Sequence, residues 1–201
     1  MLTCSPTGIG KFIQLVTHFP FSHVSIALSD HPDKFYSFAR YYQCAPFYAG
    51  FTVESAMRYK GHDVPVRVYR VPISDLQMTD VRSILQSPDF DREKYIYNLF
   101  SALNVPLQRR ILINKAYTCA EFALQIMNLC GLPVEQNGFY SIKELGEVMS
   151  PYLFYQGEIA DFAQFNGWGS DPFLTPPLGR WTSLRRQMGN IKLLFARKMR
   201  A

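Results

Sequence analysis

The chain has 201 residues, of which 48% are hydrophobic and 18% are charged, and its net charge is +5. This composition excludes a disordered chain and indicates one globular domain, or one domain with an appendage. The positive charge is concentrated at one end, because residues 179–201 hold seven Arg and Lys residues and no acidic residue, which leaves a net charge of −2 for the rest. We therefore do not expect the main domain to bind nucleic acid.

The composition also bears on the cellular compartment. Residues 1–10 lack the basic and apolar regions of a secretory signal, and no run of about 18 apolar residues could span a membrane. We therefore expect a cytoplasmic protein, in which the four cysteines are free thiols. Their spacing lacks the paired pattern of zinc ligands, and they stand at Cys4, Cys44, Cys119 and Cys130. No metal and no cofactor is predicted.

The N-terminal part of the chain is predicted to hold one helix followed by strands. Apolar residues at helical spacing predict the helix over residues 8–18. β-Branched and aromatic residues predict four strands, over residues 22–28, 35–40, 51–54 and 64–71. His23 stands at the head of the first strand, and a turn at residues 29–33 would make a hairpin that brings Ser37 beside that strand. We expect the strands to form an antiparallel meander.

The second half of the chain is predicted to be mainly helical. Capping residues and apolar periodicity predict helices over residues 74–86, 92–103 and 119–130, and a short helix that begins at Ser141. Pro88 and Asp89 would separate the first two of these helices, and residues 153–157 are predicted to return as a strand. Together the elements predict an α+β fold.

The C-terminal region differs in composition from the rest. We predict a main domain over residues 1–165, a Gly/Pro-rich linker over residues 166–179 and a basic amphipathic helix over residues 180–201. The apolar residues of this helix recur at spacings of three and four, at Trp181, Leu184, Met188, Ile191 and Phe195. Two interpretations stay open: the helix docks on its own domain with its basic face in solvent, or it binds an anionic membrane surface or a partner.

Cys119 is a candidate nucleophile because it falls in the first turn of a predicted helix that Thr118 caps and Gly131 ends. Helix N-termini stabilise thiolates, and their free N–H groups can stabilise the oxyanion that forms when a thiolate attacks a carbonyl. The alternative is a buried cysteine that only packs in the core, since cysteine is among the most buried residue types.

A cysteine nucleophile needs a histidine elsewhere in the chain. Of the four histidines, His31 and His62 lie in predicted loops, and His18 ends a helix, where a cation is favourable. His23, at the head of a strand, is the candidate partner of Cys119. A histidine on a sheet that faces a cysteine at a helix N-terminus is the arrangement of papain-like thiol enzymes, although here the histidine precedes the cysteine.

Residues 21–28, 35–38 and 117–122 together resemble a known family. This family is the circularly permuted papain-like hydrolases, the YiiX-like amidases of the NlpC-type clan, which are akin to lecithin:retinol acyltransferase-like proteins. The resemblance covers residues 2–162 and leaves the basic C-terminal region outside.

The resemblance implies a permuted papain-like fold, in which an antiparallel sheet packs against the helix that carries the nucleophile. It implies Cys119 as the nucleophile and His23 as the general base. Family members commonly orient the imidazole with a polar residue on the following strand, where this chain offers Ser37. Glu54 on the next strand is the alternative, because a nearby carboxylate raises the pKa of a histidine. Because its register places it beside the His23 strand, Ser37 is slightly preferred over Glu54 as the residue that orients the imidazole.

The leading hypothesis is therefore a thiol hydrolase that cleaves an amide or ester bond of a peptide, conjugate or lipid through an acyl-enzyme at Cys119. A second hypothesis is an acyltransferase or phospholipase that uses the same pair at a membrane surface, which residues 180–201 would contact. The third is a catalytically inactive papain-like interaction module, because a fold alone does not guarantee its chemistry.

Overall fold

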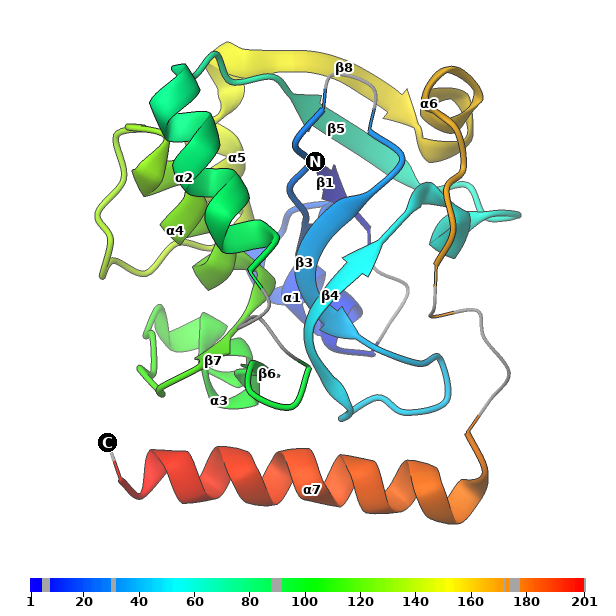
Figure 1. Cartoon of the computed structure of the whole chain (residues 1–201), viewed down its shortest axis with the longest axis vertical. Helices are drawn as coiled ribbons and strands as arrows, with labels where there is room; N and C mark the ends of the chain where they lie inside the picture. Colours follow the sequence, from blue (N-terminus) through cyan, green and yellow to red (C-terminus); the bar gives the residue numbers. More distant parts are fainter. Residues whose placement is uncertain (5–7, 30–31, 88–91, 172, 174–177, 201) are drawn as a thin grey trace.

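The computed structural model describes residues 1–4, 8–29, 32–87, 92–171, 173 and 178–200. These residues form an α+β fold with two four-stranded sheets, which confirms the fold class predicted from the sequence (Figure 1). Parts of the turn predicted at residues 29–33, and the break predicted at residues 88–89, lie outside the described residues.

Each sheet collects strands that are far apart in the sequence. The first sheet has the order β2-β1-β5-β8 and is antiparallel throughout. Its strands are β1 (Leu2–Thr3), β2 (His23–Val24), β5 (Pro65–Tyr69) and β8 (Leu153–Glu158). The second sheet has the order β3-β4-β6-β7, in which only β6 and β7 are parallel. Its strands are β3 (Phe35–Arg40), β4 (Ala49–Glu54), β6 (Ile96–Tyr97) and β7 (Ala116–Tyr117).

The predicted antiparallel meander is wrong beyond the β3–β4 hairpin, because β5 pairs with β1 and β8 instead of β4. The strand predicted over residues 22–28 is also shorter than expected. Only β2 pairs with β1, and Ile26 forms an isolated bridge with Tyr36 of the other sheet. The chain therefore passes from one sheet to the other within this segment. Alternation of apolar residues identifies a strand and its buried face, but it does not identify the pairing partner.

Four of the helices predicted before residue 166 are confirmed. Two of them begin with the capping boxes that the sequence indicates, Ser74 with Gln77 and Ser141 with Glu144. The four helices are α1 (Gly8–Thr17), α2 (Asp75–Leu85), α4 (Cys119–Leu129) and α5 (Ile142–Val148). The described residues also form three short 3-10 helices, η1 (Ala56–Tyr59), η2 (Val105–Leu107) and η3 (Ser150–Tyr152).

The helix predicted over residues 92–103 is wrong, because this segment forms β6 and then the short helix α3 (Leu99–Leu103). Asn98 separates the two elements. Its side chain caps α3 by accepting a hydrogen bond from the N–H of Ser101 at 3.1 Å, and its amide donates to the carbonyl of Ile111 at 2.7 Å. Tertiary pairing of β6 with β4 and β7 thus overrides a helical periodicity.

Helix α4 lies at the centre of the core, and apolar side chains cover it on two sides. Ala123 and Leu124 belong to a cluster with residues of the first sheet and α5. Phe122 packs on the other side against Phe38 and Phe51 of the second sheet, with ring centroids 5.1 and 5.6 Å away. The first residue of α4, Cys119, is therefore held between the two sheets.

The segment predicted as a linker makes specific contacts with the domain. It follows a helix that the sequence did not predict, α6 (Ile159–Asn166). The carbonyl of Trp168 accepts a hydrogen bond from the N–H of Met57 at 2.9 Å, and Asp171 is buried. Residues 172 and 174–177 of the predicted linker lie outside the described residues.

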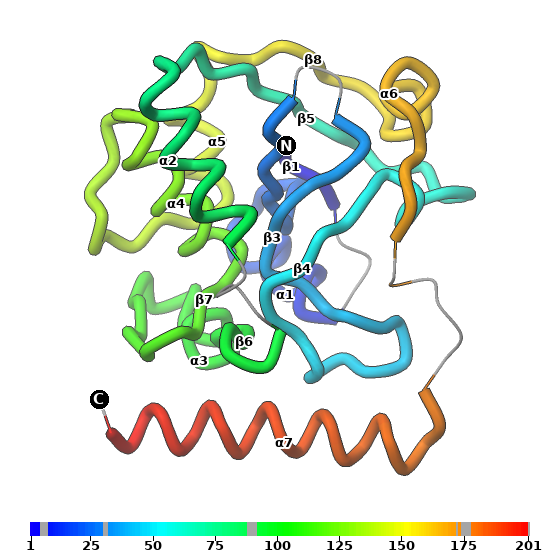
Figure 2. Tube along the Cα trace, viewed as in Figure 1, coloured from blue at the N-terminus to red at the C-terminus, as the bar shows by residue number. Residues whose placement is uncertain are grey.

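Helix α7 (Arg180–Lys198) runs along one edge of the molecule, past α3 and the loop between β3 and β4 (Figure 2). The helix contacts its own domain, and one residue of the predicted apolar stripe takes part, because Phe195 packs edge-on against Phe100 with ring centroids 5.0 Å apart. Asn190 donates a hydrogen bond to the carbonyl of Ala49 at 3.0 Å, and Leu194 is the buried apolar residue of the contact. None of the described helices, α7 included, is long and apolar enough to cross a bilayer.

Candidate active site

Cys119 is the first residue of α4, and the residues around it fix this position. The Oγ1 atom of Thr118 accepts a hydrogen bond from the N–H of Glu121 at 3.1 Å, and the Glu121 carboxylate accepts one from the N–H of Thr118 at 2.7 Å. This capping box sets the start of the helix, so Cys119 occupies the positive end of the helix dipole. Only 4% of Cys119 is exposed, and the residue lines a cavity.

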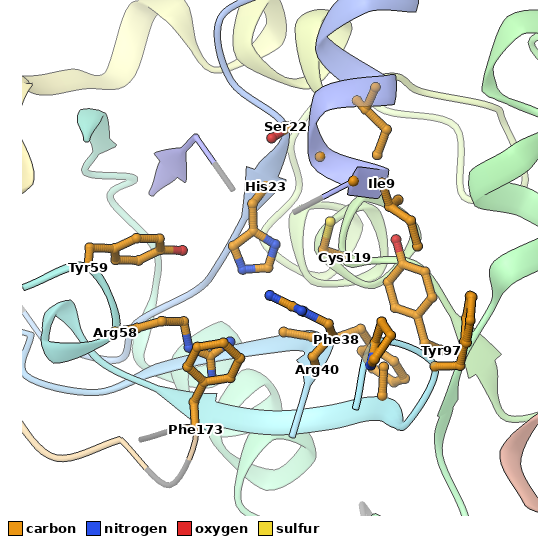
Figure 3. A pocket seen from close by; sticks show the side chains of 17 residues that line it. Ile9, Ser22, His23, Phe38, Arg40, Arg58, Tyr59, Tyr97, Cys119 and Phe173 are labelled. Atoms are coloured by element: carbon orange, nitrogen blue, oxygen red, sulfur yellow. The ribbon is translucent and has the colours of Figure 1, made fainter. Parts of the chain in front are cut away.

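His23 lies between Cys119 and Glu54. Its imidazole forms a hydrogen bond with the side chain of Cys119, and its Nε2 atom lies 2.5 Å from Oε1 of Glu54. Figure 3 shows the other ring nitrogen, Nδ1, on the side that faces Cys119. The thiol of Cys119 on α4, the imidazole of His23 on β2 and the carboxylate of Glu54 on β4 thus lie next to one another in that order, and all three residues are buried.

The carboxylate of Glu54 controls the ionisation of His23. Burial by itself lowers the pKa of His23, but the negative charge of Glu54 and hydrogen bonds with Cys119 and Glu54 outweigh burial and raise the pKa to about 10. Burial by itself raises the pKa of Glu54, but the positive charges of His23 and Arg58 outweigh it and lower the pKa. At neutral pH the pair is therefore an imidazolium and a carboxylate.

Ser37 also lies at the imidazole, on β3. Its hydroxyl donates to the carbonyl of Val24 at 2.8 Å, and its Oγ atom lies 3.4 Å from Nε2 of His23. The Glu54 carboxylate is closer to the same nitrogen, at 2.5 Å. The sequence favoured Ser37 as the residue that orients the imidazole, but the distances favour Glu54. The structure brings all four predicted site residues together.

Two further charged residues, Arg58 and Asp171, lie on the side of Glu54 away from His23. Arg58 follows Glu54 by four residues in the sequence, and its Nη1 atom is 2.8 Å from Oε2 of the Glu54 carboxylate. The same guanidinium makes two parallel hydrogen bonds to Asp171, from Nε to Oδ2 at 2.8 Å and from Nη2 to Oδ1 at 3.0 Å. Asp171 also accepts a hydrogen bond from the N–H of Ser55 at 3.1 Å. Glu54 is therefore paired with His23 through Oε1 and with Arg58 through Oε2, and Asp171 holds Arg58 in place.

A cavity of about 350 Å³ opens beside Cys119 and His23. Its wall is mostly apolar, with side chains from α1, β3, the loop after β3 and the segment before α7, among them Ile9, Ile13, Phe38, Pro46, Phe47 and Phe173. Two arginines, Arg40 and Arg58, also line it. The thiol is thus buried from bulk solvent but open to a ligand of small or moderate size.

Tyr97 of β6 completes the wall near the thiol. Figure 3 shows its hydroxyl directed toward Cys119. Burial first, and then the neighbouring Cys119 and Glu121, raise the pKa of Tyr97 well above its usual value. Its hydroxyl therefore stays protonated and can donate a hydrogen bond in the cavity.

Sequence reasoning did not single out Arg40, Arg58, Tyr97 or Asp171. The spacing of Arg58 from Glu54 gave no signal, because Glu54 ends the strand β4 and Arg58 lies in the following 3-10 helix η1, so the two residues do not share a helix. Asp171 stands in a Gly/Pro-rich segment, where composition alone indicates a linker. Within the described ranges, no group of three or more His, Cys, Asp or Glu residues is arranged to hold a metal ion.

Comparisons of the chain with protein families, with curated proteins and with solved structures found no match.

Proposed function

We propose that this protein is a thiol hydrolase with a permuted papain-like fold, which cleaves an amide or ester bond through an acyl-enzyme at Cys119. The alignment of Cys119, His23 and Glu54 beside an open cavity is the observation that carries the proposal. In the reducing cytoplasm that the sequence predicts, Cys119 stays a free thiol, as it is in the structure.

In the first half of the reaction, the thiolate of Cys119 adds to the carbonyl carbon of the substrate, while the thiol proton resides on His23. The first-turn N–H groups of α4 and the hydroxyl of Tyr97 are the donors available to the oxyanion. The intermediate then collapses, the bond to the leaving group breaks, and His23 gives its proton to the leaving amine or alcohol.

In the second half, water attacks the carbonyl carbon of the thioester and gives a proton to His23. Cleavage of the carbon–sulfur bond releases a carboxylic acid, and the proton held by His23 restores the resting pair. Glu54 holds the imidazole in position through Nε2 and stabilises its positive charge. Arg58 and Asp171 act as positioning residues, because Arg58 holds Glu54 and Asp171 holds Arg58.

Alkylation of the four cysteines tests the proposal without a known substrate. Iodoacetamide labelling is followed by peptide mass spectrometry at about pH 6, where an ordinary thiol is almost fully protonated. Cys44 is the internal reference because it is exposed, whereas Cys119 is buried. We expect Cys119 to react at least about tenfold faster than Cys44, and His23→Ala to remove this difference.

The matched control is His62→Ala, which removes an exposed histidine and should leave the labelling of Cys119 unchanged. If Cys119 labels more slowly than Cys44 in the native protein, or only after unfolding, the thiol is a core residue. The chain would then be an interaction module without catalytic activity.

One observation supports a second candidate function. Helix α7 turns large apolar side chains toward solvent, which favours an acyltransferase or phospholipase that uses the same pair at a lipid surface. In the acyltransferase reaction a lipid hydroxyl, and not water, attacks the thioester, whereas a phospholipase uses water. Product analysis with a short acyl ester and added alcohol distinguishes transfer from hydrolysis, since transfer gives a new ester and hydrolysis gives a free acid.

A further inference from the structure

Arg40 is a cation of the cavity wall whose charge has no counterion among the described residues. It is the last residue of β3 and lines the same cavity as Cys119, and Figure 3 shows its guanidinium beneath the imidazole of His23. Its Nη1 atom donates to the carbonyl of Gln43 at 3.4 Å, and its Cζ atom lies 5.3 Å from the ring centroid of Phe173. Neither contact supplies a negative charge.

The neighbouring Arg58 differs in this respect, because Glu54 and Asp171 neutralise it. Burial first, and then the like charge of Arg58, lower the pKa of Arg40. A half-buried cation next to another cation is unfavourable unless an anion joins it. The cavity therefore has a position for one negative group beside the thiol.

We propose that Arg40 binds a carboxylate of the substrate, located close to the scissile carbonyl group. The planar guanidinium matches a carboxylate through two parallel hydrogen bonds. The apolar wall of the cavity would bind an apolar portion of the same molecule. The substrate class is thus an amide or ester that carries a carboxylate near the bond to be cleaved. This inference rests on the proposed function.

Two alkylating reagents test the inference. Iodoacetate and iodoacetamide share a leaving group and nearly the same size, but iodoacetate carries a carboxylate next to the attacked carbon. The quantity to measure is the ratio of their labelling rates at Cys119, with the ratio at exposed Cys44 as reference. We expect Arg40→Gln to lower the ratio at Cys119 at least about threefold, because one nearby positive charge is lost.

Arg40→Lys keeps the charge and should retain more of the ratio than Arg40→Gln. The matched control is Arg82→Gln, which removes an exposed arginine on α2 and should leave the ratio unchanged. If Cys119 labels fast but the ratio is the same with and without Arg40, the carboxylate site is overturned and the thiol hydrolase stands. If Cys119 is unreactive toward both reagents, both proposals fail.

Helix α7 carries a second inference, which depends on different residues. Its contact face is held by polar bonds: Gln187 accepts from the N–H of Phe47 at 3.2 Å, Asn190 donates to the carbonyl of Ala49, and Arg197 donates to the carbonyl of Lys115 at 3.0 Å. Leu194 is buried in the contact, and Phe195 packs edge-on against Phe100, with ring centroids 5.0 Å apart. Four other large apolar residues form a stripe at the surface, with exposed fractions of 84% for Trp181, 51% for Leu184, 44% for Met188 and 86% for Met199.

Exposed basic residues flank this apolar stripe on the helical wheel, Arg185 and Lys192 on one side and Arg180 and Lys198 on the other. No acidic residue occurs in α7. We infer that α7 lies on an anionic lipid bilayer, with Trp181 and its apolar neighbours among the acyl chains and the basic residues at the phosphates. Apolar area and basic charge together determine this kind of binding.

The test is co-flotation of the full chain with vesicles of phosphatidylglycerol and phosphatidylcholine in equal parts. We expect binding to these vesicles and not to pure phosphatidylcholine, and a decrease of at least about fivefold for the double variant Leu184→Ser and Met188→Ser. Phe165→Ser is the matched control, because Phe165 is 83% exposed on α6 and away from the stripe.

Equal binding of the double variant and the native chain would overturn the bilayer assignment, and so would an absence of binding to anionic vesicles. Sedimentation of the chain without vesicles tests whether the stripe instead forms a dimer contact. If the native chain is a dimer and the double variant is a monomer, a second copy of the chain covers the stripe, and the bilayer assignment is overturned.

Discussion

Arg58 and Asp171 form a two-bond ion pair across 113 residues of the chain, with Nε 2.8 Å from Oδ2 and Nη2 3.0 Å from Oδ1. The side chain of Asp171 is fully buried in this contact. The pair connects the segment before α7 to Glu54, and through Glu54 to His23. The conformation of a Gly/Pro-rich segment is thereby coupled to the candidate active site.

Asp171→Asn should therefore destabilise the protein, because it leaves the buried charge of Arg58 only partly compensated. We expect the free energy of unfolding in urea to fall by about 3 kcal/mol. Asp161→Asn, at an exposed position of α6, is the control and should change it by less than about 0.5 kcal/mol. Equal effects of the two substitutions would contradict a structural role for the ion pair.

Glu54→Gln should lower the pKa of His23 from about 10, because it removes the negative charge that outweighs the effect of burial on this pKa. NMR titration of the His23 ring protons measures this change directly. The variant should also slow alkylation of Cys119 at about pH 6 by at least about tenfold, since the imidazolium that stabilises the thiolate is lost. A ring that titrates at the same pH in both proteins would show that Glu54 does not control it.

The raised pKa of His23 predicts a pH dependence of stability with a definite sign. The unfolded chain releases the His23 proton near pH 6.5, while the folded chain keeps it until about pH 10. The stabilisation is therefore complete below about pH 6.5 and is lost as pH rises toward 10, by at most about 1.4 kcal/mol per pH unit. Urea unfolding should show the stability difference between the native chain and His23→Gln shrinking over this interval. A difference that stays constant or grows would contradict the assignment.

Gly169→Ala should destabilise the chain. Gly169 has φ +66°, and a Cβ there would collide with the carbonyl oxygen of Asp33 and with Ser55. We expect a loss of at least about 1 kcal/mol in the free energy of unfolding. Gly189→Ala is the matched control, because a Cβ there meets nothing within 4 Å, and inside α7 it should stabilise by about 0.5–1 kcal/mol.

The sequence predicted those elements whose signals are local. Thr118 and Gly131 bound α4, and Ser74 and Ser141 begin α2 and α5, because caps act within one turn. The pairing of the strands could not be predicted, since periodicity does not specify a partner. The helix predicted over residues 92–103 failed for the same reason, because contacts with distant strands decided its conformation.

The residues of the candidate site also fall into those that local sequence signals could predict and those that they could not. Cys119 and His23 could be found from their positions within a helix and a strand, and Glu54 from its place on the next strand. Asp171 and Arg40 could not, because nothing in the local sequence shows which side chains a folded chain brings to one cavity. For α7, the spacing of apolar residues identified the helix, but the bonds that Gln187 and Asn190 make to backbone groups of the domain could not be predicted.

The 113-residue separation between Arg58 and Asp171 has a consequence for synthesis on the ribosome. His23, Glu54 and Cys119 emerge well before Asp171 and Phe173, so the early part of the chain can collapse while Arg58 still lacks one of its two partners. Contacts between residues distant in sequence form late in folding, because closing a long loop costs entropy. The candidate site would thus acquire its complete set of contacts only after Asp171 and Phe173 have left the ribosome, so it is not fully assembled while the preceding part of the chain is being made.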